Sequence, residues 1–290
     1  MLIFPDFDPV IFSIGPAKVR WYGLTYVIGF VFAWWLARRR CQRPASIISP
    51  VQVDDLIFYG MVGVIAGGRL GYMFFYGWTQ LADDPWYLIR IWEGGMSFHG
   101  GLIGVMLAMW WFGRSRLQKP MWAVTDFVAP LVPLGLGFGR IGNFINGELW
   151  GGPAGNLPWA MQVRCDGIVN RFDLCQRKLG LAPDAELTPP LHPSMLYESL
   201  LEGFVLFAIL WWFSAKPRPY RAVSGLFLLL YGVFRFIVEF FRMPDTHLPN
   251  NGYLAFDWLT MGQVLTTPMI IVGGTLIYLA YRSNTTEAKA

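Results

Sequence analysis

Residues 135–152 read Gly-Leu-Gly-Phe-Gly-Arg-Ile-Gly-Asn-Phe-Ile-Asn-Gly-Glu-Leu-Trp-Gly-Gly, and this stretch decides how the rest of the chain is interpreted. It ends a long apolar segment and places four polar side chains within nine residues: Arg140, Asn143, Asn146 and Glu148. An arginine this close to hydrocarbon is energetically costly, so it is expected to face a bundle interior or a water-filled cavity. The glycines also match Gly-x-Gly-x-x-Gly, but no strand–turn–helix pattern surrounds them, which argues against a dinucleotide site.

The composition is that of a membrane protein. Of the 290 residues, 54% are apolar and only 14% are charged, whereas a soluble domain carries about 25% charged residues. With a mean hydropathy of +0.41, this balance predicts several membrane spans rather than one anchor. The net charge of +4 is not arranged as a basic stripe with base-reading aromatics, so no nucleic-acid partner is expected. The N-terminus lacks the basic region of a cleavable signal peptide, so the first span is expected to be retained.

Seven apolar segments each come close to the roughly 20 residues that a helix needs to cross the hydrocarbon layer. They lie at about residues 21–37, 56–76, 96–112, 121–145, 194–213, 223–241 and 258–281. We therefore predict an all-α polytopic membrane protein in which residues 1–290 form one integral membrane domain. Residues 1–18 are too broken to span and are expected at an interface. Residues 147–190 are polar and rich in proline and glycine, so they predict a small head between the fourth and fifth spans.

The basic residues give this topology its direction. In the seven-span arrangement twelve of the 23 lysines and arginines fall together on one side: Arg38, Arg39, Arg40, Arg43, Arg114, Arg116, Lys119, Lys216, Arg218, Arg221, Arg282 and Lys289. Short loops rich in lysine and arginine stay in the cytoplasm. The C-terminus is then cytoplasmic, whereas the N-terminus and the head are periplasmic. No internal repeat indicates a transporter with inverted halves.

The three cysteines fit the same map. Cys41 lies on the cytoplasmic side, where it should be reduced. Cys165 and Cys175 both lie in the head, where a disulfide can persist. The sequence alone leaves both a bridge and two free thiols open.

The sixth predicted span carries a charged stripe. Tyr231, Arg235, Glu239 and Arg242 follow one another at spacings of four, four and three, so they share one helix face. A purely structural interpretation pairs Arg235 with Glu239 and leaves Arg242 free. Charge at membrane depth indicates a functional site by default, and we favour that interpretation for Arg235.

Two histidines occupy positions of interest. His99 precedes two glycines near the start of the third span, and its usual pKa of about 6.5 suits proton transfer. Function and structure are equally open for His99. His192 precedes Pro193 and Ser194, and we interpret it as a cap or loop anchor.

Other chemistries find little support. No pair of histidines or carboxylates has metal-ligand spacing with a third partner, so neither a metal nor another cofactor is expected. No Gly-x-Ser-x-Gly elbow appears, although Ser194 stays open as a nucleophile. Arg69 and Asp126 are expected to orient or neutralise other groups. Two or three arginines near the outer leaflet indicate an anionic ligand, for which phosphate is the natural partner of guanidinium.

At this point the chain resembles a known family. The run from Gly139 to Gly151 is similar to the signature of the bacterial phosphatidylglycerol–prolipoprotein diacylglyceryl transferases. Five shorter runs also resemble motifs of that family: Trp21–Gly23, Gly67–Arg69, Phe98–Leu102, His192–Ser194 and Tyr231–Arg235. The similarity covers nearly the whole chain in order.

The resemblance implies a seven-span enzyme of the bacterial inner membrane that acts on two partners, phosphatidylglycerol and a prolipoprotein signal peptide. It implies transfer of the diacylglyceryl group to the thiol of the lipobox cysteine, with a thioether and glycerol 1-phosphate as products. The catalytic residues implied are His99, Arg140, Arg235 and Tyr22, with His99 as the candidate base. The substrate-binding and lipid-binding set is Arg69, Arg140, Asn143, Asn146, Glu148, Tyr231, Arg235 and Glu239. We expect a monomer that otherwise contacts only membrane lipids.

Two other classes of protein compete with this interpretation. An anion transporter or channel would use the arginines as its pathway, and it predicts inverted repeats with polar groups on both sides of the midplane. An intramembrane hydrolase needs a nucleophile beside a base, and the sequence shows no such pair.

Overall fold

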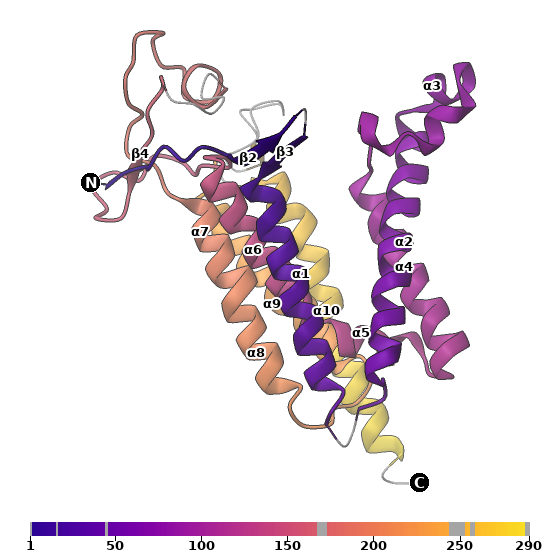
Figure 1. The fold of residues 1–290 in the computed structure, drawn as a ribbon. Coiled ribbons are helices and arrows are strands. Elements are labelled where there is room, and N and C mark those ends of the chain that lie inside the picture. The colour runs from indigo at the N-terminus through magenta and orange to yellow at the C-terminus, as the bar shows by residue number, and fades with distance from the viewer. Residues whose placement is uncertain are drawn as a thin grey trace. The chain divides into compact units, whose positions relative to one another are not determined.

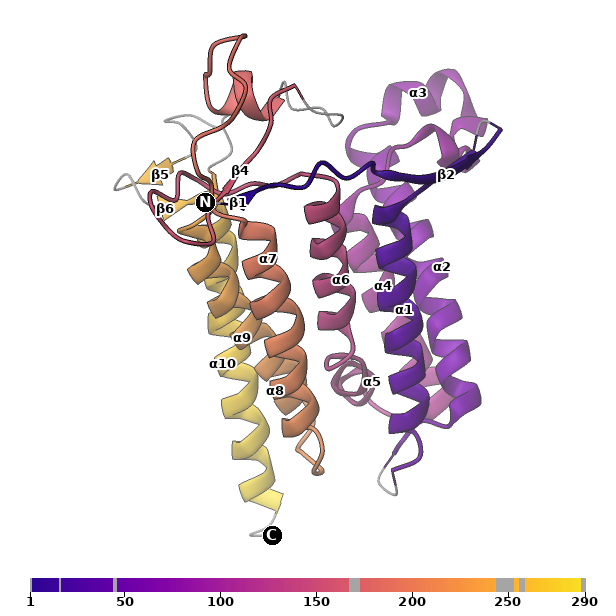
Figure 2. The same cartoon turned by 60° about the vertical axis from the view of Figure 1, so that its left-hand side comes forward.

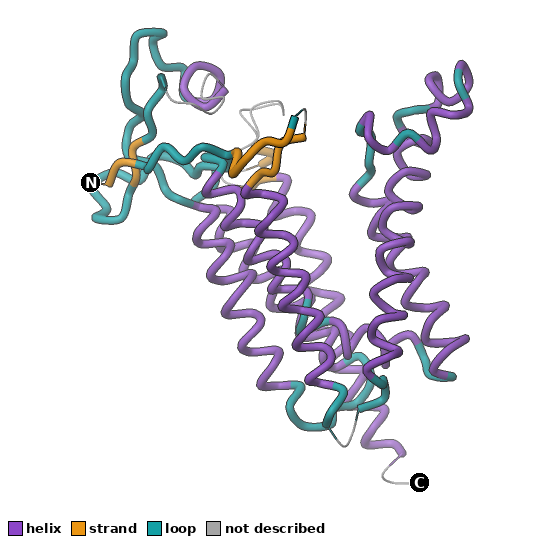
Figure 3. Tube along the Cα trace, in the orientation of Figure 1, coloured by secondary structure: helices purple, strands orange, loops and turns teal. Residues whose placement is uncertain are grey.

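The computed structural model of the protein describes residues 2–15, 17–43, 46–166, 173–243, 253–255 and 259–287. Its N-terminal half contains β1 (Leu2–Ile3), β2 (Val10–Ile14), β3 (Ala17–Arg20), α1 (Trp21–Arg40), α2 (Pro50–Phe75), α3 (Trp78–Asp83), η1 (Pro85–Ile89), η2 (Ile91–Glu93), α4 (Phe98–Phe112), η3 (Gly113–Leu117), α5 (Met121–Val128) and α6 (Val132–Ile145). The remainder contains β4 (Met161–Gln162), η4 (Asp173–Lys178), α7 (Ser194–Glu198), η5 (Ser199–Val205), α8 (Leu206–Phe213), α9 (Ala222–Glu239), β5 (Tyr253–Ala255), β6 (Leu259–Thr260) and α10 (Met261–Glu287). Helices dominate, and the strands are short (Figure 3).

Several helices can cross a membrane. Within the described residues, four are long and apolar enough: α2, the continuous run Ser194–Phe213, α9, and α10 as far as Arg282. A fifth is added if α5 and α6 count as one bent span. The prediction of a helical protein with several spans is therefore confirmed, whereas the count of seven stays a prediction.

The predicted fourth span, residues 121–145, consists of two helices that together pass as one span bent by 43°. The helix from Met121 ends at Val128, and a second begins at Val132. Pro130 lies in the break, where it lacks an N–H and disfavours helical geometry at the residue before it. Pro133 lies in the first turn of α6, a position that proline tolerates.

The chain folds into two compact units, residues 1–33 with 129–290, and residues 34–128. In the second unit, α2 and α4 pack so closely that their backbones meet at glycines. A Cβ placed on Gly104 would overlap the carbonyl oxygen of Gly63, and one on Gly100 would overlap that of Gly67. Small residues at such positions are the usual way for membrane helices to come into close contact.

In the first unit, α9 and α10 lie side by side (Figures 1 and 2). Glycines again set the helix contacts. α9 packs against α10, where Gly225 meets Gly273. α6 packs against η5, where Gly137 and Gly203 leave no space for a Cβ. The hydroxyl of Ser199 donates to the carbonyl of Gly137 at 2.9 Å across the same contact. Because the two backbones are so close at Gly137 and Gly203, nearby side chains on α6 and α7 can reach one another.

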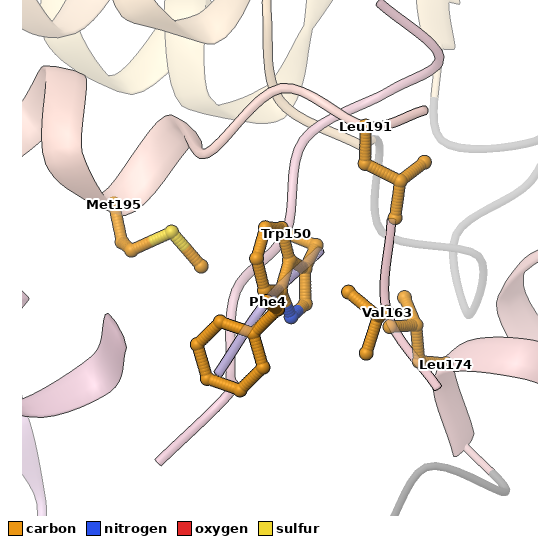
Figure 4. Close-up of a cluster of buried hydrophobic side chains, with 6 residues drawn as sticks. All are labelled: Phe4, Trp150, Val163, Leu174, Leu191 and Met195. Atoms are coloured by element: carbon orange, nitrogen blue, oxygen red, sulfur yellow. The ribbon is translucent and has the colours of Figure 1, made fainter. Parts of the chain in front are cut away.

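The head has its own small core. It is formed by six buried side chains (Figure 4): Phe4, Trp150, Val163, Leu174, Leu191 and Met195. Phe4 belongs to the N-terminal segment, and it reaches this core because β1 pairs in parallel with β4. Cys165 and Cys175 form a disulfide with their Cα atoms 6.0 Å apart, which resolves the alternatives that the sequence left open.

Replacing Gly104 by alanine should destabilise the packing of α2 on α4. The new methyl group would overlap backbone that cannot move without separating the helices, and such overpacking costs about 1–3 kcal/mol. Gly274 of α10 is the matched control, since a Cβ there meets nothing within 4 Å. Thermal unfolding in detergent should show a lower Tm for Gly104→Ala only. Equal Tm values for the two variants would contradict the close approach.

Candidate functional site

Three guanidinium groups converge on one buried carboxylate in the first unit. Glu198, at the end of α7, is fully buried. Its Oε2 lies 2.6 Å from Arg140 Nε, and its Oε1 lies 3.4 Å from Arg235 Nη1. Nη1 of Arg242 also pairs with Glu198 Oε1. The structure thus brings together the two predicted catalytic arginines through a residue that we had not singled out.

A second carboxylate binds two of the same arginines. Oε2 of Glu239 lies 2.8 Å from Arg235 Nη2 and 3.4 Å from Arg242 Nε. Its Oε1 accepts a hydrogen bond from the Thr260 hydroxyl at 3.0 Å. The predicted Arg235–Glu239 pair is therefore present. The expectation that Arg242 is left free was wrong, because the chain turns at the end of α9 and carries this guanidinium back toward both carboxylates.

A third carboxylate lies one helical turn beyond Glu198. Glu202 is as deeply buried, with 1% of its side chain exposed, but its ion pair with Arg235 Nη1 is long, at 4.0 Å. Three guanidiniums and three carboxylates thus occupy one cluster. Buried charges require such partners, because an uncompensated ion in a low-dielectric interior is strongly destabilising.

Polar side chains near the end of α6 and just beyond it extend this cluster. Arg140 Nη1 donates to the Asn143 side-chain oxygen Oδ1 at 3.5 Å, and Asn143 Nδ2 donates to Glu148 Oε2 at 3.3 Å. Asn146 Nδ2 donates to Glu148 Oε1 at 3.2 Å. The four side chains that the sequence grouped within nine residues therefore form one connected network, running from Arg140 to Glu148.

Backbone contacts fix the loop that carries Glu148. The amide of Gly151 donates to the carbonyl of His192 at 2.9 Å, and the amide of His192 donates to Gly152 at 3.0 Å. The hydroxyl of Ser194 donates to the carbonyl of Leu149 at 2.8 Å. His192 is thus confirmed as a loop anchor. Ser194 is fully buried and bonded to backbone, which disfavours it as a nucleophile.

The His192 side chain belongs to a small aromatic group beside the anchor. Its Nδ1 lies 3.1 Å from the Tyr197 hydroxyl, which also accepts from Trp159 Nε1 at 2.8 Å. Burial lowers the pKa of His192. Burial thus favours the neutral imidazole, which packs against the Phe241 ring with 5.2 Å between ring centroids.

Two predicted tyrosines also belong to the first unit. The Tyr22 ring packs against α6 at Gly142, and its hydroxyl lies 3.2 Å from that of Tyr26. Tyr231 stacks on Phe227, with 5.9 Å between ring centroids, one turn before Arg235 on α9. Tyr22 thus packs against the helix that carries Arg140, and Tyr231 lies on the helix that carries Arg235.

Arg69 lies in the second unit and is buried by its own loop. Its Nε donates to Leu88 at 2.9 Å, its Nη1 to Gly95 at 3.1 Å, and its Nη2 to Arg90 at 3.1 Å, in each case to the backbone carbonyl. Two further carbonyls accept from the same guanidinium, those of Tyr87 and Gly94. Arginine has five N–H donors, so all of them are satisfied by backbone. The geometry favours a loop-holding role over the lipid contact expected for Arg69.

His99 is the second residue of α4, in the same unit as Arg69. Ser97 caps the helix, since its hydroxyl accepts from the Gly100 amide at 3.2 Å. The amide of Ser97 in turn donates to Gly68, the residue before Arg69. The His99 side chain is exposed and contacts the Phe98 ring, so an imidazole is available at this helix end.

The sequence is similar to known proteins over nearly its whole length. A model of the prolipoprotein diacylglyceryl transferase family matches residues 9–279. This chain belongs to that family. A phosphatidylglycerol–prolipoprotein diacylglyceryl transferase of Mannheimia succiniciproducens is 54% identical over 282 residues, covering 97% of this chain and 96% of that protein. Proteins with the same name from Methylococcus capsulatus and Ectopseudomonas mendocina are 55% and 52% identical, covering 97% and 100% of this chain and 98% and 100% of their own lengths.

In this member of the prolipoprotein diacylglyceryl transferase family, the cluster consists of arginines and glutamates that pair with one another. Among the described residues, no group of three or more histidines, cysteines or carboxylates could hold a metal ion. Glu198 and Glu202 are the residues that sequence reasoning missed. The signal was present, because two glutamates four residues apart interrupt an apolar segment, the same argument that singled out Arg235.

Removing the Arg69 guanidinium should loosen residues 84–97. Arg69→Ala removes hydrogen bonds to five carbonyls of this loop, of which those of Tyr87 and Arg90 keep a backbone donor. Each carbonyl that is left dry and without a donor costs about 1–3 kcal/mol. Arg69→Lys should fail as well, because one ammonium cannot reach carbonyls on both sides of the loop. Hydrogen exchange of these residues should accelerate in both variants.

The control for this test is Arg90→Ala in the same loop. It removes two exposed ion pairs, with Asp84 at 2.6 Å and Glu93 at 3.2 Å, which are worth about 0–1 kcal/mol. Its exchange should stay near that of the unmodified protein. Unchanged exchange in Arg69→Ala would show that the loop does not depend on the guanidinium.

Proposed function

We propose that the protein transfers the diacylglyceryl group of phosphatidylglycerol to the thiol of a prolipoprotein lipobox cysteine, the first step of lipoprotein maturation. The products are a thioether-linked prolipoprotein and glycerol 1-phosphate. Family membership and the names of the relatives support this reaction. The observation that carries it in the structure is the convergence of Arg140 and Arg235 beside the loop of Asn143 and Glu148.

The reaction moves negative charge from sulfur to phosphate. The thiol loses its proton to a base, the sulfur forms a bond to the glyceryl carbon, and the carbon–oxygen bond to the phosphate breaks. The phosphate monoester leaves with the bonding electrons. Guanidiniums already oriented at that phosphate would stabilise the charge as it develops, and a donor in a water-poor site is worth roughly 2.7–4 kcal/mol.

The three arginines differ in access to a lipid. The side chain of Arg140 is 26% exposed, whereas those of Arg235 and Arg242 are each 16% exposed. We propose that the phosphate meets Arg140 first and then reaches Arg235. Planar guanidiniums suit this task, because each presents two parallel N–H donors to phosphate oxygens.

The remaining site residues would act on the two substrates. His99 is the proposed base for the thiol, whose usual pKa of about 8.5 leaves it mostly protonated at neutral pH. Positioning is assigned to the polar and aromatic groups around the cluster: Tyr22, Asn143, Asn146, Glu148, Tyr231 and Glu239. Arg69 would contribute through the loop that leads into α4. Such positioning makes the encounter of thiol and lipid effectively intramolecular.

We propose seven spans and a single membrane domain in the bacterial inner membrane. α4 continues through η3, and residues 98–117 have the roughly 30 Å length that the hydrocarbon layer needs. α1 has 20 residues and ends in three arginines, as a helix leaving on the cytoplasmic side does. The head of residues 147–190 is then periplasmic, and we propose a monomer.

Reporter tags test this orientation. Tags after Arg43, Lys119 or Arg221 should report the cytoplasm, because these sites follow clusters of basic residues. Tags within residues 153–158 should report the periplasm. Alkaline phosphatase and green fluorescent protein fusions give opposite readouts for the two sides. A cytoplasmic head would rule out the proposed site, since the lipobox cysteine is exported before modification.

The reaction itself is tested with purified protein, phosphatidylglycerol and a lipobox peptide, whose mass should rise by one diacylglyceryl group. Arg140→Lys and Arg235→Lys should each lower turnover by about 10²-fold or more, because lysine keeps the charge but loses the planar fork. Arg116→Lys should keep normal turnover, because this arginine lies in η3 and donates to the Tyr59 hydroxyl rather than to a cluster residue. A peptide of unchanged mass with the unmodified protein would refute the proposed reaction.

A second comparison separates leaving-group stabilisation from simple charge pairing. If Arg235 served only to neutralise Glu239, then Arg235→Ala would be rescued in part by Glu239→Gln. We expect no rescue, since the double variant still lacks a donor for the phosphate. Thermal stability measured beside turnover identifies any variant that has lost its fold.

A further inference from the structure

We infer that Glu198 is the positioning residue that holds the guanidiniums of Arg140, Arg235 and Arg242 in one constellation before the lipid arrives. The inference rests on the proposed function and deepens it. Among the described residues, Glu198 is the carboxylate that pairs with all three arginines, whereas Glu239 pairs with two and Glu202 with one.

The three guanidiniums reach Glu198 from separate parts of the chain. Arg140 projects from α6 and Arg235 from α9, while Arg242 follows α9 and is joined by a β-bridge to Gly151. Glu198 itself lies where the α-helical α7 passes into the wider turn of η5. The carboxylate is thus the point at which two helices and the head-side loop are linked by charge.

The charges of the three arginines explain why a carboxylate is needed at position 198. Three like charges gathered around one point repel one another. Glu239 pairs with Arg235 and Arg242 but not with Arg140, so Glu198 is the anion that offsets the repulsion among all three. Glu198 has no exposed surface, so it cannot be replaced by a solvent ion without movement of the helices.

The same geometry explains how the site could accept a phosphate. Arg140 binds Glu198 through Nε, while its Nη1 makes only a long contact of 3.5 Å with Asn143. Glu198 therefore fixes the inner edge of this guanidinium and leaves the outer donors for a phosphate oxygen. Donors oriented in advance need no rearrangement during the reaction, which is the main benefit of electrostatic preorganisation.

Glu202 provides a matched control. It lies four residues after Glu198 on the same helix, is equally buried, and has the same side chain. Its ion pair is a single contact of 4.0 Å. Glu202→Gln therefore removes a buried carboxylate from the same cluster while leaving the three-way contact in place.

The test compares Glu198→Gln with Glu202→Gln in nanodiscs containing phosphatidylglycerol, using a lipobox peptide and mass detection of the thioether. We expect Glu198→Gln to lower kcat at least 30-fold and to change KM for phosphatidylglycerol less than threefold, because the positive charges remain but lose their arrangement. Glu202→Gln should lower kcat by no more than a tenth of the factor seen for Glu198→Gln, because Glu202 has a single long ion pair with Arg235. A purely structural role would instead reduce the folded fraction and leave kcat per folded molecule unchanged.

An activity-independent measurement accompanies the kinetics. Phenylglyoxal modifies accessible arginines, and peptide mapping by mass spectrometry locates the products. Modification of Arg140 and Arg242 should rise at least fivefold in Glu198→Gln and stay within twofold in Glu202→Gln. If Glu198→Gln does not fold, Glu198→Asp replaces it, and its shorter side chain should lower kcat at least tenfold.

The outcomes separate the two claims. An unmodified protein that forms no thioether refutes the proposed function, and the phenylglyoxal pattern then decides the inference alone. Normal thioether formation by folded Glu198→Gln or Glu198→Asp overturns the inference and leaves the function standing. Equal loss of kcat in Glu202→Gln, or unchanged arginine reactivity in Glu198→Gln, also overturns it.

Discussion

The burial of charge at membrane depth is the constraint on which this structure depends. Arginines can be placed there only if carboxylates accompany them, and the cluster meets this requirement with Glu198 beneath three guanidiniums. The partners must also come within ion-pair distance, which the helices achieve by meeting at glycines. Where Gly137 meets Gly203, the backbones of α6 and η5 come close enough for Arg140 to reach its carboxylate. Packing and chemistry therefore share one cause.

Arg69 and Arg140 both lie in apolar helices, but their guanidiniums have different partners. Arg69 gives every donor to backbone carbonyls of its own loop, and it orders chain. Arg140 gives its inner edge to a carboxylate and remains partly exposed, which suits a ligand. An arginine in an apolar segment is thus a structural or a functional residue according to which acceptors the fold supplies, and its sequence position does not distinguish them.

The sequence predicted the apolar helices and the polar residues after α6, because hydropathy and local spacing carry that information. It could not predict the partners of Arg242, since these depend on how the chain turns after α9. Glu198 and Glu202 interrupt an apolar run, and the hydropathy of that run predicts a span without indicating which arginines the two carboxylates meet. Pro130 marks the break before α6, but the apolar residues on both sides of it predict one continuous span. The β1–β4 pairing and the place of Phe4 in the head core had no local signal, since their partners lie about 160 residues away.

The position of Phe4 in the head core affects when that core can form during synthesis. Phe4 completes a core whose other members extend to Leu191 and Met195, so the N-terminal segment leaves the ribosome long before its binding partners. At about 5–20 residues per second, the interval is roughly 10–40 s. During it, apolar helices such as α2 are made while Phe4 has not yet met these partners. Contacts of such sequence separation form late. The head core is therefore completed only when Leu191 and Met195 meet a segment that was made well before them.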